Sequence, residues 1–195
     1  MLQLSLAALQ SAAEITYRQV LPTPQINWPL LSERCGCQVW VKHENHNLTG
    51  AFKVRGGLVY MHRLRQREPA CPGVITATRG NHGQSVALAA GTCVPTDSAD
   101  TFADGLAVRV PNPDALALMQ GNIEQIVSVS DEEISQAMAW LFTDTHNVAE
   151  GAGAAALAAL YKQRELNRGC RVGVVLSGGN VDASLYARVL SQQGA

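Results

Sequence analysis

Apolar and polar positions alternate along the chain with spacings that predict both helices and strands. Apolar residues recur at helical spacing over residues 3–18, and Pro22-Thr23-Pro24 cannot continue that helix. Residues 38–42 are rich in strand-forming side chains, and residues 73–77 and 171–176 are apolar runs bounded by turn residues. We therefore expect a short strand at the first of these sites and buried strands at the other two.

The remaining segments continue this alternation. Strands are expected at residues 106–110 and 123–129, and helices at residues 53–67, 82–90, 113–119 and 153–166. Ser130 and Glu133 have the spacing of a capping box, and the apolar stripe that follows is expected in the core; its members are Ile134, Ala137, Met138 and Leu141. Alternating strands and helices indicate an α/β class with a largely parallel sheet.

Composition narrows the class of protein further. The chain has 195 residues, of which 47% are hydrophobic and 16% charged, as expected for a globular core. The net charge of −1, without any block of like charges, argues against a nucleic-acid or membrane surface. The apolar first residues lack the basic start of a signal peptide, so an amphipathic helix is expected there. No apolar run is long enough to cross a membrane.

Cysteine and histidine positions give no sign of a disulfide framework or a metal site. The five cysteines are odd in number and lack CxxC spacing, which indicates reduced thiols in a cytoplasmic protein. His43 and His46 lie three positions apart, but no second pair accompanies them. We therefore expect a loop at these histidines and no metal ligands.

Lys53 stands in an unusual setting for a lysine. It follows Thr49-Gly50 and the aromatic Phe52, and the helical pattern begins at Lys53 itself. Apolar flanks and a positive helix terminus both disfavour the charged amine, and a neutral lysine is the nucleophile that attacks an aldehyde. An ordinary surface lysine at a helix end is the alternative interpretation of Lys53 taken alone.

Two polar turns follow buried strands and precede helices. The turn from Thr78 to His82 offers backbone donors, a hydroxyl, a guanidinium and an amide, which suit a carboxylate or phosphate. Asn81 could bond a polar ring substituent. The turn from Ser177 to Asn180 should face a ligand crevice, where its hydroxyl could bond a ring nitrogen. In both cases a purely structural glycine turn is the alternative.

Residues 150–156 contain a superficial dinucleotide fingerprint, G-x-G-x-x-A. The segment before it, residues 145–149, is too polar for the strand that the fingerprint requires, and no acidic residue ends a strand some twenty positions later. We therefore reject nicotinamide binding. The small residues predict close helix packing, with Glu150 as a candidate site residue.

Taken in order, these motifs resemble the fold-type II pyridoxal-phosphate enzymes, specifically the serine/threonine dehydratase (threonine ammonia-lyase) and serine racemase group. The matching stretches are Thr23-Pro24, Val41 to Glu44, Thr49 to Gly57, Ala77 to Ser85, Ala103 to Gly105, Glu150 to Ala154 and Leu176 to Asn180. The resemblance covers nearly all of the chain. It implies a tryptophan-synthase-β-like α/β fold, an open parallel sheet with flanking helices, in incomplete form.

The resemblance also implies roles for individual residues. Lys53 would bond to pyridoxal 5′-phosphate and later remove the substrate α-proton. Phe52 would pack beside the pyridine ring, Asn81 would bond the 3′-oxygen, and Ser177 would meet the ring nitrogen. The expected set is completed by Glu150 on the cofactor and by Thr78, Arg79, Gly80 and His82 on the substrate carboxylate, with no metal ligand.

The implied reaction is dehydration of L-threonine, L-serine or a related hydroxy-amino acid to a 2-oxo acid and ammonia. A serine partner leaves the ring nitrogen neutral, which suits rapid β-elimination of a hydroxyl. Where the racemases of this family place a second acid/base serine, this chain has Arg79, which stays protonated. A dehydratase is therefore favoured, with a serine racemase as an alternative. Ala51, in place of the usual serine, is a mild departure.

A more serious departure lies between Ala90 and Asp97. Most of the family's small domain, including the glycine loop that holds the cofactor phosphate, would stand there. We expect residues 1–70 and 97–195 to form an incomplete, discontinuous cofactor-binding domain, and residues 71–96 to be a remnant of the small domain. A catalytically inactive remnant that serves as a binding scaffold is therefore a further alternative.

The expected partners follow from the same resemblance. They are a small amino-acid substrate and a second copy of the chain in a homo-oligomer, most simply a dimer. Neither nucleic acid nor membrane is expected, and the cytoplasm is the expected location.

Overall fold

The chain divides into two compact units. The computed structural model describes residues 5–70, 100–107 and 123–192, together with Pro113, Ala117 and Met119. The first unit takes Met1–Leu21 and Lys53–Ile126, and the second takes Pro22–Phe52 and Val127–Ala195. The chain therefore passes from the second unit to the first between Phe52 and Lys53. Because residues 71–96 fall outside those described, the expected remnant of a small domain stays a prediction.

A sheet of three strands lies at the centre of the described part of the second unit. β2 (Gln38–His43) lies between β1 (Gln25–Asn27) and β3 (Arg171–Leu176). β1 runs antiparallel to β2, whereas β3 runs parallel to it, with Val41 opposite Val174. The valine-rich sequences of β2 and β3 suit a pleated, half-buried surface. The strands predicted at residues 38–42 and 171–176 are thus confirmed, and so is the α/β class.

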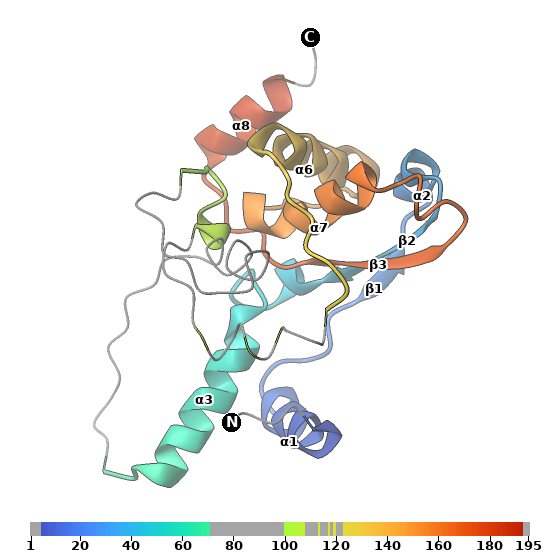
Figure 1. Ribbon diagram of the computed structural model, residues 1–195. Coiled ribbons are helices and arrows are strands. Elements are labelled where there is room, and N and C mark those ends of the chain that lie inside the picture. Colours follow the sequence, from blue (N-terminus) through green and yellow to red (C-terminus); the bar gives the residue numbers. More distant parts are fainter. Residues whose placement is uncertain are drawn as a thin grey trace. The chain divides into compact units, whose positions relative to one another are not determined.

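Four helices and a short 3₁₀ turn accompany this sheet in the described part of the second unit. They are α2 (Pro29–Cys35), η1 (Glu44–His46), α6 (Asp131–Thr145), α7 (Gly151–Lys162) and α8 (Ala183–Ser191). α6 and α7 pack side by side, and α7 also packs against β3 (Figure 1). The predicted capping box is present at the start of α6, with both of its hydrogen bonds formed. The predicted stripe of α6 is buried in the core.

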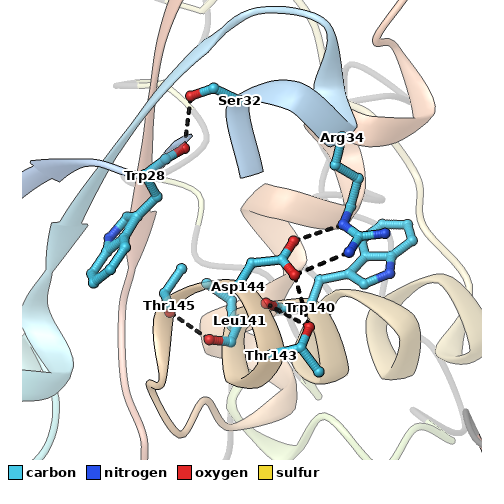
Figure 2. A network of polar contacts seen from close by, with 8 residues as sticks. All are labelled: Trp28, Ser32, Arg34, Trp140, Leu141, Thr143, Asp144 and Thr145. Atoms are coloured by element: carbon cyan, nitrogen blue, oxygen red, sulfur yellow. Dashed lines mark hydrogen bonds and ion pairs between the residues drawn. The ribbon is translucent and has the colours of Figure 1, made fainter. Parts of the chain in front are cut away.

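A network of side chains joins α2 to α6 (Figure 2). The guanidinium of Arg34 donates two hydrogen bonds to the carboxylate of Asp144, at 2.7 and 3.0 Å. It also lies over the ring of Trp140, 4.8 Å from the ring centre. Thr143 donates a further hydrogen bond to Asp144. Because only 5% of the Asp144 side chain is exposed, its charge depends on these donors.

The first unit contributes three described elements. They are α1 (Leu6–Tyr17), α3 (Lys53–Arg67) and the 3₁₀ turn η2 (Asp104–Leu106). α1 and α3 pack against each other, and the guanidinium of Arg55 lies over the ring of Tyr17. The helices predicted over residues 3–18 and from Lys53 to before Glu68 are confirmed. No described helix has the length and apolarity to span a membrane.

Three predicted elements differ from the structure. Residues 123–129 form no strand, because no described strand pairs with them. Leu106 lies in η2 rather than opening a strand over residues 106–110. The helix predicted over residues 153–166 begins two residues earlier and ends at Lys162, where turns take over. The strand predicted at 73–77 and the helix predicted at 82–90 lie outside the described residues.

Candidate active site

The polar turn that follows β3 is joined to the loop that precedes α3 by main-chain hydrogen bonds. The N–H of Phe52 donates to the carbonyl of Ser177 at 2.9 Å, and the N–H of Gly179 donates to the carbonyl of Gly50 at 2.9 Å. Ala51 and Gly178 form an isolated antiparallel bridge between these bonds. Two segments far apart in sequence are thereby held in fixed register at the carboxyl end of a parallel strand, where ligands bind in open α/β sheets.

A third segment, at the start of α7, completes this arrangement, which we call the loop junction: residues 49–52, 177–180 and 148–153. Glu150 is the N-cap of α7, and its N–H donates to the carbonyl of Gly178 at 3.1 Å. Ser177 and Ala152 are linked by a long hydrogen bond of 3.5 Å from the serine hydroxyl to the carbonyl. The hydroxyl of Ser177 is therefore only weakly engaged.

Glycine is required at the loop junction because the segments approach too closely for side chains. A Cβ on Gly153 would lie 2.2 Å from the carbonyl oxygen of Gly178, and one on Gly178 would lie 2.4 Å from Oε1 of Glu150. Gly50 has a φ of +70°, and a Cβ there would meet Oδ1 of Asn180 at 2.3 Å. The small residues of 150–156 therefore serve close packing, as the sequence predicts, and the carboxylate of Glu150 lies against Gly178.

Asn180 links the two loops through its side chain as well. Its Nδ2 donates to the carbonyl of Thr49 at 2.8 Å, while the hydroxyl of Thr49 donates to the carbonyl of Ala51 at 3.3 Å. These contacts fix the backbone just before Phe52 and Lys53. The glycine-rich turn of residues 177–180 is thus hydrogen-bonded to the loop of residues 49–52, which directly precedes Lys53.

A buried carboxylate supports this loop from one side. Glu44, 5% exposed, accepts hydrogen bonds from the hydroxyl of Thr23 at 2.8 Å and from Nδ2 of Asn47 at 2.5 Å. The carbonyl of Asn47 in turn accepts from the N–H of Gly50 at 2.8 Å. Nζ of Lys42 lies 4.0 Å from Glu44 and donates to the carbonyl of Thr23 at 2.6 Å. A chain of hydrogen bonds therefore runs from Glu44 to the loop junction.

Sequence reasoning did not single out Glu44. The sequence does carry a signal for it. Glu44 is an acidic residue that directly follows a predicted strand, and amide and imidazole side chains surround it in the sequence. Almost no acidic side chain is fully buried without hydrogen-bond donors, so a charge at that position calls for partners.

Two histidines, His43 and His46, lie close to Glu44 in the sequence and contact each other. His43 is fully buried and stacks on His46, with ring centres 4.9 Å apart. Nε1 of Trp28 donates to Nε2 of His43 at 2.9 Å, so that nitrogen carries no proton. Burial, and then the neighbouring His46, lower the pKa of His43 below its usual value. The described residues contain no cluster suited to a metal ion.

The structure brings some of the predicted site residues together. Phe52, Ser177 and Glu150 all belong to the loop junction, and the ring of Phe52 remains 41% exposed. Lys53 directly follows Phe52 and is the first residue of α3. Lys53 is exposed, and the effect of its apolar flanks on the amine stays a prediction. The predicted substrate and ring-oxygen residues Thr78, Arg79, Gly80, Asn81 and His82 lie outside the described residues.

Comparison with known proteins shows which proteins this chain is similar to. L-threonine ammonia-lyase of Thermotoga maritima is 29% identical over 129 residues, which are 66% of this chain and 32% of that enzyme. L-threo-3-hydroxyaspartate ammonia-lyase of a Pseudomonas species is 34% identical over 111 residues, 57% of this chain and 34% of that enzyme. The chain thus spans about a third of the length of these curated relatives.

A solved structure and a family model agree with these relatives. A threonine deaminase from the organism abbreviated T.th. superimposes with a TM-score of 0.75 at 19% identity, over 92% of this chain and 99% of that one, which shows the same fold. The model named "Pyridoxal-phosphate dependent enzyme" matches residues 17–93 and 89–178. Because these matches cover most of the sequence, the chain belongs to the family of pyridoxal-phosphate dependent enzymes.

Proposed function

We propose that this chain is a pyridoxal-phosphate dependent ammonia-lyase that converts a hydroxy-amino acid to a 2-oxo acid and ammonia. The observation that carries the proposal is the hydrogen bond between the N–H of Phe52 and the carbonyl of Ser177. It holds the loop that ends at Lys53 against the turn that carries a weakly engaged hydroxyl. The names of the two ammonia-lyase relatives support the reaction class and the substrates L-threonine and 3-hydroxyaspartate, and L-serine is proposed as a third substrate.

The described residues fit a flat aromatic cofactor. Glycines at 50, 178 and 179 let the segments of the loop junction pack closely, because a Cβ at any of these positions would meet a neighbouring group. Phe52 offers an exposed apolar face, and the hydroxyl of Ser177 keeps capacity for a ring nitrogen. Lys53, on an exposed helix start next to Phe52, is the group that would bond covalently to the cofactor's aldehyde.

In this proposal each residue has a defined task. Nζ of Lys53 takes the α-proton of the substrate, and Phe52 and Ser177 orient the ring beside it. When bound, pyridoxal phosphate would supply an electron sink for the pair left at the α-carbon. The β-hydroxyl then leaves with a proton as water, and hydrolysis consumes a water as it releases ammonia. Thr78 to His82 are proposed to hold the substrate carboxylate, and Asn81 the 3′-oxygen.

Covalent labelling tests the proposal. The full chain is incubated with pyridoxal phosphate, reduced with borohydride and digested for peptide mapping. We expect a pyridoxyl group on Lys53 and a 2-oxo acid from at least one of the three substrates, with both signals absent in Lys53→Arg. Labelling spread over surface lysines and unchanged in that variant would contradict the assignment of Lys53.

A binding remnant without catalysis is the second candidate. It is favoured by the coverage, since the residues matched to this chain make up about a third of the length of its curated relatives. In that case Lys53 is labelled but no 2-oxo acid forms from any substrate. Formation of D-serine from L-serine would instead support a racemase.

Homodimerisation and a cytoplasmic location are also proposed. Sedimentation of the purified chain tests the oligomeric state, and fractionation of its native cells tests the location.

A further inference from the structure

Three cysteines gather at the amino ends of β2 and β3, the opposite ends of these strands from the loop junction. Cys35 is the last residue of α2, and Cys37 directly precedes β2. Cys170 directly precedes β3. All three are free thiols in the structure.

The strand register places Cys37 opposite Cys170. In the parallel pair, Gln38 lies opposite Arg171 and Val39 opposite Val172, so one step back along both strands reaches the two cysteines. The N–H of Gln38 donates to the carbonyl of Cys170 at 2.8 Å, which continues the ladder to this position. The N–H of Gly169 donates to the carbonyl of Gly36 at 2.9 Å and holds the two chain segments together just beyond it.

Side-chain alternation places both thiols on the same face of the sheet. Cys37 shares its face with Val39 and Val41, which are fully buried, and Cys170 shares its face with the partly or fully buried Val172 and Val174. Adjacent strands lie roughly 4.8 Å apart, which is within the Cα separation of about 4.4–6.8 Å that a disulfide spans. The strand spacing is therefore compatible with a disulfide between the two cysteines.

The two thiols differ in access to solvent. Cys170 is exposed, whereas Cys37 is buried, with 6% of its surface accessible. Burial, followed by the proximity of Cys170, raises the pKa of Cys37. Burial also raises the pKa of Cys35 to about 11, so Cys35 remains a thiol at neutral pH. A soluble oxidant therefore meets Cys170 first, and Cys37 is the neighbour that resolves the product.

We propose that Cys37 and Cys170 form a reversible disulfide when the chain meets a hydroperoxide. The sulfur of Cys170 takes one oxygen from hydrogen peroxide, the O–O bond breaks, and one water leaves. The sulfur of Cys37 then attacks the resulting sulfenic acid, an S–S bond forms, and a second water leaves. Two thiols are oxidised by two electrons and one peroxide is reduced. The bond joins the starts of two neighbouring strands that are far apart in sequence.

Peptide mapping of the full chain tests this proposal without any cofactor, so it stands apart from the proposed lyase activity. Trypsin cuts after Arg34, Lys42, Arg168 and Arg171, so one peptide carries Cys35 and Cys37 and another carries Cys170. After treatment with a small excess of hydrogen peroxide, we expect these two peptides joined, and separated again by dithiothreitol. The oxidised chain should also unfold at a higher urea concentration than the reduced chain.

Matched variants assign the bond. Cys35→Ser should keep the cross-link, whereas Cys37→Ser and Cys170→Ser should each abolish it and the rise in urea midpoint. Cys170 is exposed, so its serine variant is expected to fold normally. A cross-link that survives in Cys37→Ser and disappears in Cys35→Ser would overturn the proposal. So would sulfinic acid on Cys170 alone, with Cys37 still a free thiol.

Discussion

The loop junction and the α2–α6 contact both join segments that are distant in sequence, but they do so with different groups. At the loop junction, the bonds between Phe52 and Ser177 and between Gly179 and Gly50 are main chain to main chain. At the α2–α6 contact, the side chains of Arg34 and Asp144 bond to each other (Figure 2). The first arrangement leaves the side chains of Phe52 and Ser177 available to a ligand, whereas the second engages the side chains themselves.

Under the proposed function, this difference separates a contact at the cofactor site from a purely structural one. Backbone bonding in a glycine-rich junction fixes the positions of its segments with little side-chain volume. The cost is that an added Cβ meets a neighbouring group, which is a backbone carbonyl for Gly153 and Gly179 and a side chain for Gly50 and Gly178. A side-chain contact such as that of Arg34 can relax when one partner changes, although it leaves a buried charge behind.

The most damaging change is expected at Gly153. An alanine there gains about 1 kcal/mol of helix propensity, but its Cβ meets the carbonyl oxygen of Gly178 at 2.2 Å. Overpacking against backbone costs about 3 kcal/mol, so the clash outweighs the gain. Gly153→Ala should lower the free energy of unfolding in urea by about 2 kcal/mol or more and reduce labelling of Lys53. Gly173→Ala, at a β3 position with open space, should leave labelling unchanged.

Removal of the buried carboxylate of Glu44 should have the next largest effect. Glu44→Ala leaves the hydroxyl of Thr23 without its acceptor and leaves the amide of Asn47 with only the main-chain carbonyl of residue 44, which costs about 2 kcal/mol of stability. Glu44→Gln keeps an acceptor for Asn47 and should cost about 1 kcal/mol. Hydrogen exchange at Gly50 measures the coupling: its amide should exchange faster in Glu44→Ala. Unchanged protection at Gly50 would show that Glu44 does not support the loop junction.

At the α2–α6 contact, Arg34→Ala should cost about 1–2 kcal/mol, because Asp144 keeps only Thr143 among the donors drawn in Figure 2. The loss is moderated by solvent, since 35% of the Arg34 side chain is exposed. Arg168→Ala, which breaks the exposed pair with Glu165, is the matched control and should change stability by less than about 0.5 kcal/mol. Urea unfolding measures both, and Lys53 labelling should be equal in the two variants.

Much of this fold could be predicted because its signals are local. The valine-rich strands, the capping box of Ser130 and Glu133, and the buried stripe of α6 all depend on neighbours within a few positions. The strand β1 was not predicted, since its three residues form a strand only by pairing with β2. Residues 123–129 show the converse: a strand-like pattern with no described strand beside it stays irregular.

The site was predictable in its parts but not in its assembly. Phe52, Lys53, Glu150 and Ser177 each stand in a local context typical of a binding turn or helix start. Nothing local indicates that Asn180 bonds to Thr49, or that Glu44 bonds to Thr23, because these contacts depend on how the sheet brings distant turns together. The exposure of Lys53 was likewise hidden, since apolar neighbours in sequence need not cover a side chain in space.

The smallest expected effect is a difference in pH dependence between the two regions. Nε2 of His43 accepts from Trp28 and must be unprotonated, and burial followed by His46 lowers the pKa of His43. The unfolded chain binds that proton at a pKa of about 6.5 and the folded chain does not, so stability falls as the pH drops below about 6.5. Burial alone would raise the pKa of Asp144, but hydrogen bonds from Arg34 and Thr143 lower it overall.

The contribution of Asp144 is therefore present above the unfolded pKa of about 3.9 and is lost only as the pH falls through its lowered folded pKa. Urea unfolding from pH 8 to pH 3 should show two separate losses. In His43→Gln, whose amide oxygen can still accept from Trp28, the loss of stability near pH 6 should shrink while the loss below about pH 4 persists. In Asp144→Asn, the loss below about pH 4 should shrink while the loss near pH 6 persists. If His43→Gln keeps the full loss near pH 6, another group titrates there, and the support beside the loop junction is no more sensitive to mild acid than the α2–α6 contact.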